Sequence, residues 1–182
     1  MKVIMISGKS GHGKDTVAQM MKEILEKDNK RVLIIHFADL VKHYARDYYN
    51  WNGQKDEAGR ALLQKIGTTI MRTHYPTYWA EIIAKFISAA NEWDCVIIPD
   101  LRFQNEFETI CEHNINCETI RIERYNQDGT PYINPNMTEE QLNHVSETQL
   151  DDFAFNWIIE NRGSLEDLED SIKLILEKIM KE

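Results

Sequence analysis

A glycine-rich loop between an apolar run and an amphipathic segment constrains this chain more than any other feature. Residues 2–7 (KVIMIS) are typical of a buried strand, and residues 8–14 (GKSGHGK) fit the pattern G-x-x-x-x-G-K. Residues 15–27 then place apolar side chains at helical spacing. Glycines let a backbone curl so that successive amides point at phosphate oxygens, with a helix N-terminus behind them. The strand, loop and helix together predict a nucleotide-phosphate site rather than an ordinary glycine turn.

The loop and the start of its helix supply the candidate nucleotide contacts. We expect the lysine that ends the motif to reach the β and γ phosphates. The candidates are Gly8, Lys9, Ser10, Gly11, His12, Gly13, Lys14, Asp15 and Thr16.

Asp15 stands where the usual motif has the hydroxyl that binds Mg²⁺, and Thr16 comes next. Three interpretations stay open. Thr16 could serve the metal from one position further on, directly or through water. Asp15 could face the acceptor pocket and hold a water or a cation. Asp15 could also do no more than complement the helix N-terminus.

Short apolar runs separated by helical patterns predict an α/β fold. Such runs, rich in β-branched residues, are typical of a parallel sheet that is buried on both faces. Ser164, after Gly163, is a natural N-cap. The expected strands are 2–7, 31–37, 95–99, 117–123 and 155–160, and the expected helices include 15–27, 58–72, 77–92 and 164–181.

Length and composition fit one domain that spans residues 1–182. The turn-rich stretch 125–137 (YNQDGTPYINPNM) is too short for a domain linker and predicts a mobile flap or lid. The formal charge of −9 disfavours a nucleic-acid ligand but not a small anion held by local amides. No apolar run approaches a membrane span, and three cysteines without metal spacing suggest reduced thiols in a cytoplasm. A homodimer is left open.

Acidic and basic residues follow three of the expected strands. Ligands of open parallel sheets bind beyond the carboxyl ends of the strands, so these side chains are candidate site residues. Asp39 and Lys42 follow the second strand along the chain. Asp100 and Arg102 follow the third. Arg121 and Arg124 end the fourth, at the root of the flap, and could bring charge to the site when the flap closes.

Asp100, Arg102 and Asp39 also have a purely structural interpretation. Asp100 could hold Mg²⁺ through water, or it could cap a helix that begins near Phe103. Arg102 could clamp a phosphate with its planar fork or form a surface salt bridge. Asp39 could serve the acceptor or cap a helix that begins near Leu40. We expect the histidines without a visible partner to be structural or exposed, and the tryptophans to be core or pocket wall. These are His36, His43, His74 and His113, and Trp51, Trp79, Trp93 and Trp157.

Several segments, in order along nearly the whole chain, resemble the deoxynucleoside monophosphate kinases of phages and bacteria. They are ISGKSGHGKDTVA, FADLVK, LLQKIGTTIMR, PDLRFQNEFE, NHVSE and FNWIIENRGSLEDLEDSI. The most specific are DLRFQNE and HVSE taken with the loop. The Gly-Lys-Asp-Thr ending is itself typical of that group.

The resemblance implies a P-loop kinase fold of the nucleotide-kinase type and transfer of the ATP γ-phosphoryl to a deoxynucleoside monophosphate. It implies ATP and Mg²⁺ as cofactors, with Thr16 and Asp100 near the metal. Lys14, Asp100 and Arg102 would be the catalytic residues. The implied acceptor contacts are Asp39, Lys42, Arg72 and Arg102, and Ser146 and Glu147 are added as candidates that could simply order the end of the flap.

Other functions remain open at this stage. Animal phosphomevalonate kinases share a similar loop, a Ser-Glu pair and a last strand and helix of this style, although FADLVK and DLRFQNE fit the nucleotide kinases better. A kinase that phosphorylates a hydroxyl would need a carboxylate base, for which Asp39 is the candidate. A nucleotide sensor without catalytic activity is the remaining alternative.

Overall fold

A single parallel sheet forms the centre of the protein in the computed structural model, which describes residues 1–89, 92–113 and 116–181. The strand order is β2-β3-β1-β4-β5, and every neighbouring pair is parallel. The fold is therefore the predicted α/β fold. The strands are β1 (Lys2–Ser7), β2 (Val32–Ile34), β3 (Cys95–Ile98), β4 (Asn116–Arg124) and β5 (Trp157–Asn161).

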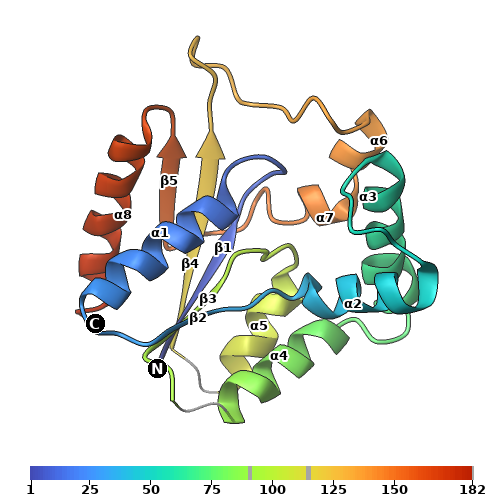
Figure 1. Cartoon of the computed structure of the whole chain (residues 1–182), viewed down its shortest axis with the longest axis horizontal. Coiled ribbons are helices and arrows are strands. Elements are labelled where there is room, and N and C mark those ends of the chain that lie inside the picture. Colours follow the sequence, from blue (N-terminus) through green and yellow to red (C-terminus); the bar gives the residue numbers. More distant parts are fainter. Residues whose placement is uncertain (90–91, 114–115, 182) are drawn as a thin grey trace.

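Helices cover both faces of the sheet (Figure 1). One face packs against α1 (Lys14–Lys27) and α8 (Leu165–Ile179), and the other packs against α4 (Tyr78–Ala89) and α5 (Gln104–Glu112). A second group of helices lies beside the carboxyl end of the sheet. It comprises α2 (Ala38–Tyr49), α3 (Glu57–Gln64), the π-helical segment η1 (Lys65–Ile70), α6 (Glu139–Leu142) and α7 (Val145–Thr148).

The apolar runs of the strands fill two cores at once. Ile4 and Ile6 of β1 face α1 and α8, whereas Val3 and Met5 face α4 and α5. All four side chains are fully buried. A strand with both faces covered needs no polar alternation, which is why the sequence pattern of this strand is continuous.

Two strands differ from the sequence prediction. The predicted strand 31–37 ends early, because the backbone N–H of His36 is taken by the Asp39 carboxylate instead of the sheet. The predicted strand 155–160 starts late, because the Asn156 side chain accepts the backbone N–H of Thr119. Residues 90–91, at the end of the predicted helix 77–92, lie outside the described residues.

The predicted helix 58–72 is α-helical only to Gln64 and continues as η1. The carbonyl of Gly67 in this widened segment accepts a hydrogen bond of 3.1 Å from the Trp79 indole. That tertiary contact has no signature in the local sequence. The predicted helices 15–27 and 164–181 are confirmed, and the predicted helix 77–92 is confirmed over Tyr78–Ala89. Ser164 caps α8 by accepting from the backbone N–H of Asp167.

Candidate active site

The glycine loop joins β1 to α1 at the carboxyl edge of the sheet, as the sequence predicts. A Cβ atom at Gly8 would lie 2.6 Å from the carbonyl oxygen of Ile122, so no side chain fits between the loop and β4. Gly13 has a φ of 96°, a left-handed conformation that favours glycine, and it precedes the first residue of α1. The loop thus has the close packing and the backbone curl that phosphate binding requires.

Lys14 folds back onto its own loop. Its Nζ donates to the carbonyl oxygens of Gly8 at 2.7 Å and Lys9 at 2.9 Å. Burial, with the nearby Arg102 charge as a second cause, lowers the pKa of Lys14 to about 7. An incoming phosphate would replace these carbonyl partners with negative charge and restore the ammonium.

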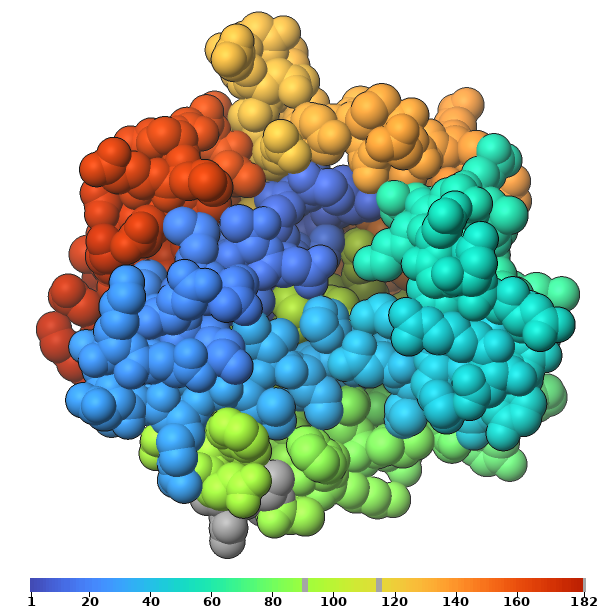
Figure 2. Space-filling model, in the orientation of Figure 1, coloured from blue at the N-terminus to red at the C-terminus, as the bar shows by residue number. Residues whose placement is uncertain are grey.

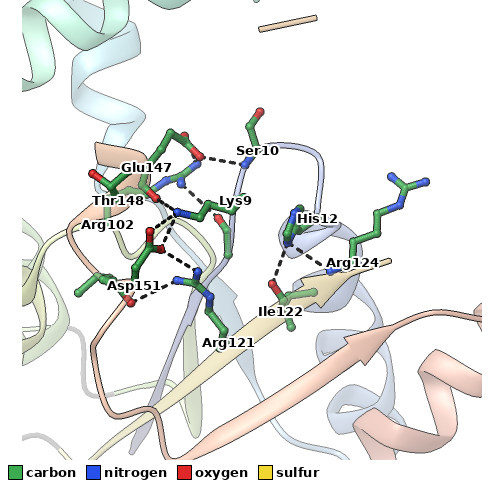
Figure 3. Close-up of polar contacts among 12 residues, drawn as sticks. Lys9, Ser10, His12, Arg102, Arg121, Ile122, Arg124, Glu147, Thr148 and Asp151 are labelled. Atoms are coloured by element: carbon green, nitrogen blue, oxygen red, sulfur yellow. Dashed lines mark hydrogen bonds and ion pairs between the residues drawn. The ribbon is translucent and has the colours of Figure 1, made fainter. Parts of the chain in front are cut away.

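Glu147, in α7, links the glycine loop to Arg102 (Figure 3). Its Oε2 accepts from the backbone N–H of Ser10 at 3.0 Å, and its Oε1 lies 2.9 Å from Nη2 of Arg102. The guanidinium also donates to the Gly8 carbonyl at 3.1 Å. Glu147 and Arg102 are both largely buried, so the surface salt bridge considered for Arg102 does not describe this pair. Arg102 is instead fixed against the loop.

Lys9 points toward the segment after α7 (Figure 3) and is not among the residues that line the cavity described below. Its Nζ donates to the Glu147 carbonyl at 2.6 Å and to Oδ2 of Asp151 at 2.6 Å. Arg121 reaches the same carboxylate at 3.1 Å. The structure therefore gives Lys9 and Arg121 a role in docking this segment onto the loop.

His12 ties the loop to β4 and to the flap. Its Nδ1 accepts from the backbone N–H of Arg124 at 3.2 Å, and its Nε2 lies 3.1 Å from the carbonyl of Tyr132. Nδ1 also lies 3.1 Å from the carbonyl of Ile122, and burial lowers the pKa of His12. Arg124 donates to the Gly11 carbonyl at 2.9 Å and stacks 4.2 Å from the Tyr132 ring centroid.

Asp100 binds the start of α2 and not the helix that begins after Phe103. Its two carboxylate oxygens accept from the backbone N–H groups of Phe37 and Ala38, each at 2.9 Å. The N-cap residue of α5 is Phe103 itself. Asp100 therefore does bind the start of a helix, as the structural interpretation proposed, but this helix is α2 and not the one after Phe103. Asp100 also lines the cavity.

His36 lies between two carboxylates, which its sequence context did not reveal. Its Nε2 is 3.2 Å from Oδ1 of Asp15, and its Nδ1 is 3.3 Å from Oδ2 of Asp39. Asp39 in turn pairs with Lys42 at 2.9 Å. Burial disfavours the imidazolium, but the hydrogen bonds to both carboxylates outweigh it and raise the pKa of His36 to about 9.

Arg72 follows η1 and is held by buried groups. It forms an ion pair with Glu106, donates to the carbonyl of Pro76 at 3.1 Å and lies 4.0 Å over the ring of Phe103. Burial raises the pKa of Glu106 to about 7, against the opposing effects of Arg72 and of the Arg102 backbone N–H. Arg72 is thus positioned by Glu106, the last residue of the DLRFQNE segment, for which sequence analysis had no individual role.

A cavity of about 640 Å³ opens among these residues. Figure 2 shows the hollow between the start of α1 and the α2–α3 region, with the segment after β3 at its floor. The candidate residues that line the cavity are Ser10, Gly11, Lys14, Asp15, Lys42, Arg72, Asp100, Arg102, Ser146 and Glu147.

Some candidates lie elsewhere. Thr16 is exposed and does not line the cavity, whereas Asp15 does. Asp39 reaches the site only through His36 and Lys42. Arg121 and Arg124 contact Asp151 and the loop backbone instead of the cavity. The cavity also includes residues that sequence reasoning missed, namely His36, Arg60, Glu106 and Asn134.

The fold and this site define a P-loop kinase, a phosphotransferase that acts on nucleotides or other small molecules. The family comparison is more specific, since the model of the deoxynucleotide monophosphate kinase family matches residues 46–172. The chain belongs to that family. The matched range begins after the glycine loop, so loop and family match are separate observations.

Solved structures of other kinases share the fold. The APS kinase CysC of Mycobacterium tuberculosis, in complex with AMPPNP and APS, is 10% identical and has a TM-score of 0.54, with 100% of this chain and 98% of that chain covered. A gluconokinase from Sinorhizobium meliloti 1021 is 11% identical with a TM-score of 0.54 and coverage of 98% and 93%. Shikimate kinase from Acinetobacter baumannii, in complex with shikimate, is 14% identical with a TM-score of 0.52 and coverage of 100% and 94%. At these identities the likeness concerns the fold alone.

No curated protein sequence matches this chain. Within residues 1–89, 92–113 and 116–181, no helix has the length and apolar character to span a membrane. The same residues hold no cluster of three or more histidine, cysteine, aspartate or glutamate side chains suited to a metal. A cytoplasmic location and the absence of a nucleic-acid ligand stay predictions, and a homodimer is left open.

Proposed function

We propose that this kinase transfers the γ-phosphoryl group of ATP to a deoxynucleoside monophosphate and releases the diphosphate. The observation that carries the proposal is the placement of Arg72 and Arg102 in the same cavity as Lys14. Two guanidinium groups in the same cavity as a phosphate loop suit a second phosphate better than an uncharged acceptor. The family to which the chain belongs supports the same acceptor.

The state of Asp39 favours a phosphate acceptor over a hydroxyl acceptor. A hydroxyl nucleophile needs a base, and Asp39 was the candidate. Burial raises the pKa of Asp39, but hydrogen bonds from His36 and Lys42 outweigh it and hold the pKa far below the usual range. So acidic a carboxyl group is a poor proton acceptor, whereas a phosphate is already anionic and needs no base.

Three residues carry the chemistry in this proposal. Lys14 holds the donor phosphates and gains charge as they bind. Arg102, fixed by Glu147 and Gly8, lies where it can stabilise charge on the transferring group. Arg72, fixed by Glu106, binds the acceptor phosphate and orients it for attack.

Mg²⁺ neutralises charge on the β and γ phosphates when it is bound with ATP. The residues that line the cavity suit it, because Asp15 and Asp100 offer carboxylate oxygens, whereas the Thr16 hydroxyl lies outside the cavity lining. Each oxygen of Asp100 already accepts one backbone N–H and so keeps capacity for a water. We therefore assign Asp100 to the metal through water and leave Thr16 and Asp15 to experiment.

Residues 125–137 act as the lid of a single domain, residues 1–182, in this proposal. Asn134 donates to Oγ of Ser10 at 2.9 Å, and a Cβ atom at Gly11 would lie 2.9 Å from the Tyr132 ring. The end of the segment thus rests on the glycine loop, while its tip projects beyond β4 (Figure 1). A lid in this position can exclude water from the phosphates.

The decisive experiment identifies the product by chromatography after incubation with ATP and Mg²⁺. The acceptors are the common deoxynucleoside monophosphates, the corresponding nucleosides and phosphomevalonate. We expect a diphosphate from at least one deoxynucleoside monophosphate and no turnover of the bare nucleosides. Diphosphate from phosphomevalonate alone would replace the acceptor, and binding of ATP without any product would favour the sensor alternative.

A further inference from the structure

Arg60 lies in α3 and contacts the glycine loop, whereas sequence analysis placed the candidate site residues at the ends of the strands. Its Nη1 donates to Oγ of Ser10 at 3.3 Å, and its side chain lines the cavity. The same hydroxyl accepts from Asn134 of the lid at 2.9 Å. Ser10 is therefore the point at which α3, the lid and the phosphate loop meet.

The guanidinium of Arg60 has hydrogen-bonding capacity that the protein does not use. Three buried side-chain nitrogens among the described residues lack a hydrogen-bond partner: Nε of Arg60, Nε of Arg72 and Nζ of Lys2. Two of the three belong to arginines that line this one cavity. A buried donor without a partner is costly, and such an atom in a native structure calls for an explanation. A ligand that accepts hydrogen bonds inside the cavity supplies one.

Arg60 also differs from three arginines nearby that pair with a carboxylate. Arg72, Arg102 and Arg121 each meet a carboxylate. Within residues 1–89, 92–113 and 116–181, no carboxylate forms an ion pair with Arg60. A planar cation with free donors beside a phosphate loop is suited to a phosphate oxygen, which can accept two parallel N–H bonds.

We propose that Arg60 is a phosphate-binding residue. When phosphates occupy the cavity, its guanidinium releases the Ser10 hydroxyl and binds an oxygen of the phosphates that lie between donor and acceptor. This inference rests on the proposed function for the identity of those phosphates. Because Arg60 belongs to α3 and touches the glycine loop, its binding to phosphate draws the two sides of the cavity together. It also adds positive charge where charge moves from acceptor to donor.

Binding of inorganic tripolyphosphate tests this role without any assumption about the acceptor. Calorimetric titration compares the wild type with Arg60→Ala and Arg60→Gln, and Arg60→Gln retains a hydrogen-bonding group for Ser10. We expect both variants to bind tripolyphosphate about tenfold more weakly or worse, as befits the loss of a charge-assisted contact. Arg46→Ala is the matched control, because Arg46 is an exposed arginine of α2 that stacks 5.4 Å over Trp51 and lies outside the cavity. It should bind tripolyphosphate like the wild type.

Turnover gives the second readout. With the best deoxynucleoside monophosphate, Arg60→Ala should lower kcat about a hundredfold, and Arg60→Lys should restore little because an ammonium lacks the planar fork. If Arg60 only anchors α3 to Ser10, then Ser10→Ala and Arg60→Ala would weaken tripolyphosphate binding equally and the double variant no further. That result, or wild-type binding by Arg60→Ala and Arg60→Gln, overturns the proposal. A wild type that binds tripolyphosphate but phosphorylates no deoxynucleoside monophosphate refutes the proposed function, while the binding comparison still decides the role of Arg60.

Discussion

Glu147 and Arg102 form a largely buried ion pair of 2.9 Å that connects α7 to the phosphate loop. The same carboxylate accepts the backbone N–H of Ser10, so the position of Arg102 depends on a residue that follows the lid. Glu147 and the Gly8 carbonyl, which lie far apart in the sequence, thus hold the Arg102 guanidinium together. This gives Glu147 a concrete role that its sequence context did not supply.

Replacing Glu147 by Gln should release Arg102 while keeping an acceptor for Ser10. We expect kcat to fall about tenfold, because a misplaced guanidinium stabilises the transferring group less well, with smaller changes in KM. Steady-state kinetics at saturating ATP measures the effect. Glu140→Gln, an exposed change in α6, is the control. Equal kcat for Glu147→Gln and wild type would show that Arg102 needs no such support.

Lys14 should take up a proton when ATP binds. Its pKa of about 7 in the empty loop leaves it mostly neutral at pH 8, and the phosphates restore the charge. We expect an uptake of about one proton per ATP at pH 8 and almost none at pH 6. Calorimetry in buffers of different ionisation enthalpy measures the uptake, and Lys14→Met should abolish it.

The catalytic rate of a Lys14→Met variant should also fall by about a hundredfold or more, with a smaller loss of nucleotide affinity. Near-wild-type turnover, or an unchanged proton uptake in the variant, would contradict the assignment of Lys14 to the donor phosphates.

His36 should make stability depend on pH in a defined window. Its pKa is about 9 in the folded protein and near 6.5 when unfolded, so its contribution is complete below pH 6.5 and disappears as pH rises through 9. After allowance for the exposure of Asp15 and Asp39, we expect about 1 kcal/mol. Urea unfolding should show His36→Gln less stable than wild type at pH 6 and equally stable near pH 9.5. His74→Gln, at an exposed site, should show no such dependence, and a pH-independent loss in His36→Gln would rule out the charged ring.

Asp15 and Thr16 can be separated by their dependence on Mg²⁺. If Thr16 serves the metal, Thr16→Val should raise the Mg²⁺ concentration needed for half-maximal rate. Asp15 lines the cavity and binds His36, so Asp15→Asn should act mainly on the KM of the acceptor. Titration of Mg²⁺ at fixed ATP, followed by acceptor titration, measures both. The opposite pattern would assign the metal to Asp15.

The sequence alone determined the elements that depend on neighbouring residues. Glycines after an apolar strand permit only a curled loop before α1, and the loop forms as predicted. The continuous apolar strands required cover on both faces and therefore a parallel sheet. Ser164 and Asp167 cap α8 within a single turn of chain. Parallel strands end at one edge of a sheet, so Asp100 and Arg102 could be predicted as site residues from their places after a strand, and both line the cavity.

Only the tertiary structure decided how the charges of the site are paired. Glu147 meets Arg102 from a helix of four residues, too short for any periodic signal. Arg60 meets Ser10 across 50 residues, and His36 meets Asp15 across 21. Such partners depend on where connections pack against the sheet, since a side chain pairs with whatever charge the fold brings within about 4 Å. Local propensity therefore predicts the loop and the sheet, while packing alone determines which cations of the cavity remain free for phosphate.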